Sequence, residues 1–150
     1  MCLDSGAEAV RADPKGFARI QWDTWSPPGW LDDSEFEETA KSFANPDWAD
    51  VTLNAYRWRL VARAVRPPYD ALQERLRSVE TLGTPTLMLQ GGADSCDAPA
   101  DSEGQEKFFT GPHQRLVLNG VGHFPAREAS GRVADAVLAH LGSPGRLPLP

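Results

Sequence analysis

Apolar residues in the first half of the chain recur at helical intervals, three or four positions apart. The longest such stripe follows Pro46 and predicts a helix of about five turns. Its members are Trp48, Val51, Ala55, Trp58, Ala62 and Val65. Acidic residues Asp47 and Asp50 stand at the start of this helix and four arginines toward its end, as the helix macrodipole favours. The basic residues therefore need no ligand to explain them.

Shorter helices are expected on either side of this one. Asp13 is suited to cap a helix that has Pro14 at its first position and ends near residues 26–29. The apolar stripe of that helix consists of Phe17, Ile20 and Trp25. Ser34 and Glu37 have the spacing of a capping box, which predicts a second short helix. One more helix is expected from the apolar positions Tyr69, Leu72, Leu76 and Val79.

The pattern changes at Thr84, where short apolar runs replace the helical spacing. Residues 86–90 form a nearly continuous apolar run that is closed by Gly91 and Gly92. Such a run is typical of a strand buried on both faces in a parallel sheet. Residues 115–118 predict a second strand of the same kind. The second half of the chain is therefore expected to contain a parallel sheet.

Helices are expected to alternate with these strands. Ser102 is suited to cap a short helix over residues 102–109, and a last helix should end at Gly142. The apolar face of the last helix consists of Val133, Val137, Leu138 and Leu141. An order of strand, helix, strand and helix implies a right-handed crossover, so both strands release their loops at the same sheet edge. Ligands bind at that edge in sheets of this type.

Composition narrows the function classes. Twenty-one acidic against fifteen basic residues give a net charge of −6, which disfavours nucleic acid as a partner because phosphate binding needs clustered Lys and Arg. The sequence contains no stretch of roughly 20 apolar residues. It also lacks a basic and then apolar leader after Met1. We therefore expect a cytoplasmic protein with no membrane segment.

Two cysteines, Cys2 and Cys96, are too few for a disulfide framework and do not have the spacing of a zinc motif. The residues around the second cysteine that could ligate a metal are Asp94, Asp97, Asp101 and His123. Their spacing matches neither a zinc pattern nor a calcium loop. The sequence therefore predicts no metal and no cofactor.

Two loops carry residues suited to acid–base chemistry. The loop after the first strand presents Asp94, and the loop after the second strand presents His123. In nucleophilic catalysis a histidine must accept a proton, and a carboxylate on its other nitrogen fixes the tautomer and stabilises the imidazolium. Asp97, three positions along the same loop, is an alternative acid. We expect an Asp94 oxygen within about 3 Å of His123 Nδ1.

These segments resemble a known family. Residues 84–94, Thr-Pro-Thr-Leu-Met-Leu-Gln-Gly-Gly-Ala-Asp, are similar to the strand and acid loop near the C-terminus of α/β-hydrolases. Gly-His-Phe-Pro at 122–125, followed by Glu128 and an apolar helix, resembles their histidine segment. The separation of 29 positions from Asp94 to His123 also agrees with that family. The resemblance implies a partial α/β-hydrolase fold, in which a helical cap precedes a strand-helix-strand-helix piece of a parallel sheet.

The resemblance divides the chain into three parts. Residues 1–80 look like a helical cap or lid, residues 81–142 like the C-terminal part of the hydrolase core, and residues 143–150 are expected to form a disordered tail. Four residues are candidates for contact with a small apolar substrate, namely Trp25, Trp30, Tyr56 and Phe124. Packing within a small helical core explains the tryptophans equally well. Tyr56 is either a donor of a proton to a leaving oxygen, as cap tyrosines are in related epoxide hydrolases, or a residue that packs its helix.

A nucleophile is missing from this pattern. The family places it in Gly-x-Ser-x-Gly, or with Asp in place of Ser, at a strand-to-helix elbow that precedes the cap. No such pentapeptide occurs in the 150 residues. We therefore expect this chain to correspond to the C-terminal part of such an enzyme and to have negligible turnover alone.

Two hypotheses of function follow. In the first, the chain belongs to a hydrolase that cleaves an ester, epoxide or halide, with His123 as base and Asp94 as the acid that orients it. In the second, it is a non-catalytic module that binds apolar ligands or another chain. Two parallel strands leave unpaired edges, so we expect either self-association or a requirement for the missing N-terminal half.

Overall fold

The computed structural model describes residues 3–61 and 69–142, with the backbone alone for three residues of one helix, Trp58, Arg59 and Val61. The chain forms two compact units. The first, here called the helical unit, is Met1–Asp23 with Leu31–Ser78. The second, here called the sheet unit, is Thr24–Trp30 with Val79–Pro150. The short segment 24–30 thus groups with the predicted core although it lies within the predicted cap, and the cap assignment itself stays a prediction.

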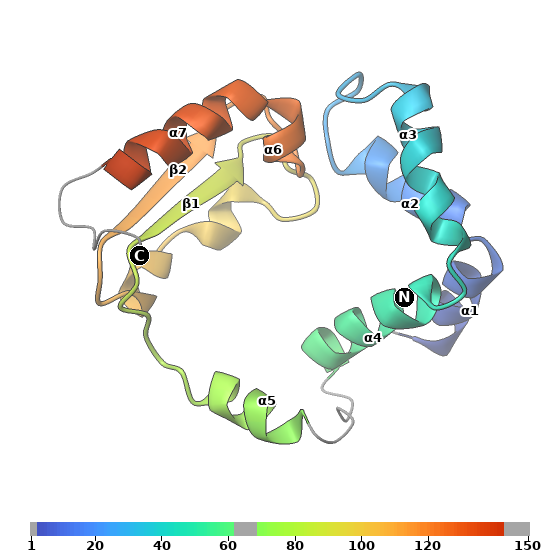
Figure 1. Cartoon of the computed structure of the whole chain (residues 1–150), viewed down its shortest axis with the longest axis horizontal. Helices are drawn as coiled ribbons and strands as arrows, with labels where there is room; N and C mark the ends of the chain where they lie inside the picture. The colour runs from blue at the N-terminus through green and yellow to red at the C-terminus, as the bar shows by residue number, and fades with distance from the viewer. Residues whose placement is uncertain (1–2, 62–68, 143–150) are drawn as a thin grey trace. The chain divides into compact units, whose positions relative to one another are not determined.

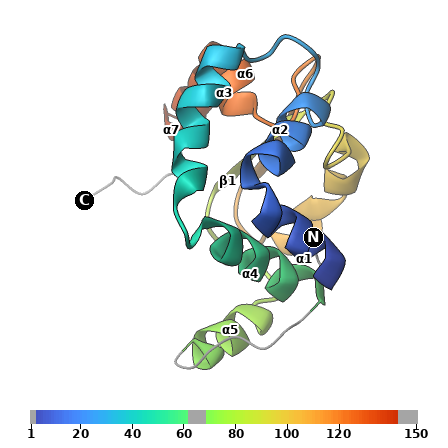
Figure 2. The same ribbon diagram turned by 90° about the vertical axis from the view of Figure 1, so that its right-hand side faces the viewer.

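The helical unit is built from short helices. They are α1 (Asp4–Ala12), α2 (Pro14–Thr24), α3 (Asp33–Ala40), the 3-10 helix η1 (Lys41–Ala44), α4 (Trp48–Val61) and α5 (Asp70–Arg77). Helices α1 and α4 lie side by side (Figure 2), and Ala7, Val10 and Leu53 are buried between them. A second small cluster joins α2 to α3 through Ala18 and Phe36. The predicted helices are present, with one more at the N-terminus.

The helix faces differ from the sequence prediction. Val51, expected on the buried face of α4, is 67% exposed, whereas Leu53 is 2% exposed. In α2, Ile20 is 63% exposed and Ala18 is buried, while Trp25 lies beyond the end of the helix. Both helices carry apolar residues on more than one side, so the partner helix decides which side is buried. The predicted members Ala62 and Val65 lie outside the described residues.

The cap of α3 also differs from the prediction. Asp32, not Ser34, is the N-cap, because its Oδ1 accepts the backbone N–H of Glu35 at 2.8 Å. The Ser34 hydroxyl donates to the same carboxylate oxygen at 2.6 Å. Glu37, expected to close a capping box, pairs with Lys15 instead. The helix begins one residue before Ser34, so the preceding aspartate satisfies the first free N–H groups.

The sheet unit contains two strands, β1 (Thr86–Gly91) and β2 (His113–Leu118). They pair in parallel, with Thr86 opposite His113 and Gly91 opposite Leu118, which confirms the predicted strands and their direction. Figure 1 shows α7 (Ser130–Gly142) lying along these strands, and the short α6 (Pro125–Glu128) precedes it. The prediction that β1 is buried on both faces was wrong, since Thr86 to Leu89 are only half-buried. The two described strands and α7 supply too few neighbours to cover both faces.

The connection between the strands is not the predicted α-helix. Two 3-10 helices stand there, η2 (Pro99–Ser102) and η3 (Gln105–Phe108). Ser102 ends the first of them instead of capping a helix, and its hydroxyl accepts a hydrogen bond from Arg115 Nε on β2 at 2.8 Å. Both loops that follow β1 and β2 nevertheless leave from the same edge of the sheet, as parallel pairing requires. Within the described ranges, no helix is long and apolar enough to cross a bilayer.

Candidate active site

Asp94 is held in place by the loop that follows β1. Its Oδ1 accepts the backbone N–H groups of Cys96 at 2.8 Å and Asp97 at 2.9 Å, which closes a tight turn around the carboxylate. The side chain is only 6% exposed. Gln90 at the end of β1 donates from Nε2 to the backbone carbonyl of Asp97 at 3.1 Å, which supports the same turn. The carboxylate therefore has a fixed position, and its Oδ2, which accepts a long hydrogen bond from Gln90 Nε2 at 3.5 Å, faces one further partner.

His123 is that partner. Its Nδ1 lies 2.8 Å from Asp94 Oδ2, and its side chain is 23% exposed. The contact expected from the sequence is therefore present, and it involves Asp94 and not the alternative acid Asp97. Because Asp94 occupies Nδ1, the other ring nitrogen, Nε2, is the one that could exchange protons with a reacting group.

The segment 24–30 joins the acid loop to the histidine loop. The backbone carbonyl of Trp25 accepts the N–H of Ser95 at 3.4 Å and the N–H of His123 at 3.2 Å. The Ser95 hydroxyl donates to the Thr24 carbonyl. Ser26 is buried, and its hydroxyl oxygen accepts the N–H of His123 at 3.0 Å. One short segment thus fixes the backbone on both sides of the acid–base pair.

Glu128 in α6 fixes the histidine loop from its other side. Its carboxylate accepts three hydrogen bonds, from the Ser26 hydroxyl at 2.7 Å, the Phe124 N–H at 2.9 Å and the Gly122 N–H at 2.6 Å. Two of these donors flank His123 in the sequence. Sequence reasoning noted Glu128 only as part of a family segment, since its position shows nothing of what it binds. The structure gives it a positioning role for the backbone around His123.

Two of the predicted substrate-binding residues contact His123, and a third stacks on one of them. The Trp25 ring meets the imidazole edge-on at 4.8 Å between centroids, and Phe124 meets it edge-on at 5.3 Å. Trp30 stacks on Phe124 at 4.6 Å. These rings give the base an apolar surround on the sheet unit. Tyr56 lies on α4 in the helical unit, and its contact with substrate stays a prediction.

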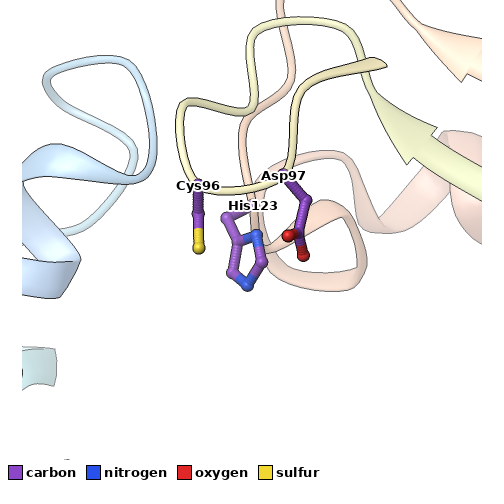
Figure 3. Close-up of side chains that lie close together, drawn as sticks. All are labelled: Cys96, Asp97 and His123. Atoms are coloured by element: carbon purple, nitrogen blue, oxygen red, sulfur yellow. The ribbon is translucent and has the colours of Figure 1, made fainter. Parts of the chain in front are cut away.

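Three potential metal ligands, which the sequence analysis did not assign to a metal site, lie close together at His123. Cys96, Asp97 and His123 each offer one potential metal-ligating atom, and these atoms all lie within 4.8 Å of one another. Figure 3 shows the three side chains pointing the same way, two from the acid loop and one from the histidine loop. No local motif connects residues 96, 97 and 123, so their spacing in the sequence could not reveal the group. The turn around Asp94 and the parallel pairing of the strands bring them together.

The surroundings of Cys96 raise the pKa of its thiol above the ordinary value. Burial raises its pKa, and the negative charges of Asp97 and Asp94 raise it further. A thiolate is the nucleophilic form of cysteine, so a raised pKa reduces its population at neutral pH. Cys96 therefore does not have the properties of an activated nucleophile.

Comparisons with known proteins bear on the fold. No protein-family model and no curated protein matches the chain. Among solved structures, it resembles the crystal structure of a "putative epoxide hydrolase" from Klebsiella pneumoniae, with a TM-score of 0.82 and 29% sequence identity. The match covers 93% of this chain and 46% of that one, so the chain spans less than half of the Klebsiella protein. The fold is thus that of part of a hydrolase-like protein, and the two-stranded parallel sheet agrees with a partial α/β fold.

Proposed function

We propose that this chain carries the acid and base of an α/β-hydrolase active site that acts on a small apolar ester, epoxide or halide. The observation that supports this most is the 2.8 Å contact between Asp94 Oδ2 and His123 Nδ1 on loops that leave parallel strands at one edge. Similarity to the Klebsiella structure supports the same class of reaction. The aromatic rings around His123 support an apolar substrate.

In this proposal the carboxylate sets the state of the imidazole. Asp94 accepts the Nδ1 proton, which leaves the Nε2 lone pair to take a proton from a serine hydroxyl or from water. The imidazolium that results is stabilised by the same carboxylate. Because the Asp94 side chain is 6% exposed, water screens this interaction weakly. With a serine nucleophile, His123 then gives its proton to the leaving group. With an aspartate nucleophile, His123 takes its proton from the water that attacks the covalent ester, and that proton passes to the released product.

The proposal requires a nucleophile from polypeptide beyond the 150 residues. Neither Gly-x-Ser-x-Gly nor Gly-x-Asp-x-Gly occurs in them. A serine would use His123 as its base directly, whereas an aspartate would use it to activate the water of the second step. In either case we expect the chain alone to turn over substrate negligibly.

A chimera tests the proposal. The segment of the Klebsiella protein onto which this chain superposes is replaced by the chain, and hydrolysis of a styrene oxide, a nitrophenyl ester and a haloalkane is compared with that of the parent. We expect activity on at least one substrate, and a loss of about 10³-fold or more in kcat for His123→Gln. His113→Gln and Asp101→Asn are matched controls that should stay within about twofold. A folded chimera that keeps its rate in His123→Gln would contradict the proposal.

The non-catalytic alternative gives a different result in the same chimera. It rests on the aromatic cluster of Trp25, Trp30 and Phe124, which suits an apolar ligand whether or not chemistry follows. A folded but inactive chimera in which tryptophan fluorescence still responds to an apolar ligand would favour that alternative. The same response lost in Trp25→Ala would place the ligand beside His123.

A further inference from the structure

We propose that Cys96, Asp97 and His123 bind a divalent cation of the zinc type. A thiol sulfur, a carboxylate and an imidazole nitrogen are the three ligand types that zinc takes in proteins, and they meet here within 4.8 Å of one another. Figure 3 shows that all three side chains extend from their loops in the same direction, which is the arrangement a shared ligand needs.

The distances are close to those of a formed site. Metal–ligand bonds of about 2.0 to 2.3 Å in a tetrahedron place ligand atoms roughly 3.3 to 3.8 Å apart. Ligand atoms up to 4.8 Å apart must therefore approach by about 1 to 1.5 Å, which side-chain rotation can supply. Cys96 and Asp97 are exposed and sit on the turn, so their rotation disturbs no packed core. Water or substrate would complete the coordination.

Asp94 prepares the site without binding the metal. Its Oδ1 fixes the backbone of both Cys96 and Asp97, and its Oδ2 holds His123 by Nδ1. A carboxylate on the far nitrogen of a ligating histidine is the arrangement that orients imidazole toward zinc and makes it more basic. Asp94 therefore organises all three ligands at once, and it directs Nε2 to be the coordinating atom.

The donor set selects among cations. Sulfur favours zinc-type metals over Mg²⁺ and Ca²⁺, which prefer oxygen ligands alone. Binding releases the thiol proton to solvent as the metal–sulfur bond forms. The positive charge of the cation also offsets the negative charges of the adjacent carboxylates. Occupancy takes the same ring nitrogen that proton transfer uses. If the proposed function holds, zinc is therefore an inhibitor of that reaction. The binding of zinc does not itself depend on the proposed function.

Cobalt titration of the purified full chain tests the site, because Co²⁺ takes zinc ligands and shows a thiolate-to-cobalt charge-transfer absorption. We expect that absorption to appear with Co²⁺, to disappear when Zn²⁺ is added and to withstand Mg²⁺ and Ca²⁺. Cys96→Ser should remove it. His123→Gln and Asp97→Asn should weaken Zn²⁺ binding by about tenfold or more. Cys2→Ser and His113→Gln are the matched controls and should keep both the absorption and the affinity.

A second measurement covers variants that fail to fold. In the unaltered chain, Zn²⁺ should slow alkylation of Cys96 and leave that of Cys2 unchanged, as read by mass spectrometry of the two peptides. The proposal is overturned if no charge-transfer absorption forms in the folded chain, if it survives Cys96→Ser, or if Zn²⁺ protects both cysteines equally. The absorption and the alkylation rates are both read without turnover, so they test this site whether or not the proposed hydrolase chemistry holds.

Discussion

The two carboxylate oxygens of Asp94 have separate partners. Oδ1 holds the backbone of Cys96 and Asp97, and Oδ2 faces His123. An acid that only paired with the histidine could rotate, because an isolated carboxylate pivots about its own bonds. Here the turn fixes one oxygen and thereby aims the other. The orientation of the imidazole is thus set by the local chain geometry of the acid loop.

Asp94→Asn and Asp94→Ala should therefore have different effects. Asparagine keeps an acceptor for the turn but faces His123 with an amide N–H, which forces the ring to the other tautomer. We expect the free energy of unfolding to fall by about 1 kcal/mol or less for Asn. For Ala we expect a fall of about 2 to 4 kcal/mol, because the buried donors are then left unpaired. Long-range ¹H–¹⁵N spectra should show His123 protonated at Nδ1 in the unaltered chain and at Nε2 in the Asn variant. The same tautomer in both would contradict this account.

The raised pKa of Cys96 gives a second prediction at this scale. Removing the charge of Asp97 lowers the pKa of the thiol, so a larger fraction is thiolate at any pH below that pKa. In a Cys2→Ser background, we expect Asp97→Asn to speed alkylation by iodoacetamide near pH 7.5 by about two- to fivefold. The rates should converge at high pH, where both thiols are ionised. Asp101→Asn serves as the control, and an equal acceleration there would point to a general loss of structure.

At the scale of elements, the sequence predicts the strands and their loops better than the helix faces. The apolar run at 86–90 predicted β1, and parallel pairing placed Asp94 and His123 at one edge. Val51 was placed on the buried face and Leu53 was left out of it, because both residues suit such a face and only packing against α1 selects one. The backbone carbonyl of Trp25 accepts hydrogen bonds from both the acid loop and the histidine loop. A pattern of side chains cannot predict a contact that a backbone atom makes.

Glu128 on α6 holds the histidine loop and segment 24–30, so its replacement should weaken the attachment of both. Its carboxylate accepts hydrogen bonds from Ser26, Gly122 and Phe124. Glutamine keeps one oxygen acceptor, and we expect it to destabilise the sheet unit by about 1 to 2 kcal/mol, against about 2 to 4 kcal/mol for alanine. Thermal unfolding measures the stability, and hydrogen exchange at Gly122 and Phe124 should accelerate most. Glu103→Gln, at an exposed site, should change neither, and unaltered exchange in Glu128→Ala would refute the positioning role.

Gly122 is placed where backbone segments approach closely. A Cβ on Gly122 would overlap Ser26, whereas one on Gly131 in α7 would meet nothing within 4 Å. Gly122→Ala should therefore destabilise the chain by about 1 to 3 kcal/mol, because segment 24–30 must move. Gly131→Ala should be neutral or stabilise α7 by up to about 1 kcal/mol, since alanine favours the helix. Denaturant unfolding of both variants measures the contrast, and equal effects would exclude the close approach as the cause.

At the scale of the whole molecule, few residues are fully buried. The buried hydrophobic residues in the described ranges are Ala7, Val10, Ala18, Phe36, Ala40, Leu53, Leu118 and Val121. Several larger apolar side chains are exposed instead, and on α5 these are Leu72 at 53% and Leu76 at 63%. The two stand four residues apart and so share one helix face. An eight-residue helix gains most of its stability from packing such a face, so we expect this surface to favour association.

We therefore expect the purified chain to associate with itself in proportion to concentration. Sedimentation velocity over a dilution series should show a rising average mass, and the double variant Leu72→Glu with Leu76→Glu should shift the chain toward monomer. Ile20→Glu is the control, because Ile20 is also 63% exposed but lies on another helix, α2. The double variant should shift toward monomer because the new charges on α5 must lose their water when two copies associate. A monomer at all concentrations, with cooperative and stable unfolding, would show that the exposed residues on α5 are tolerated without a partner.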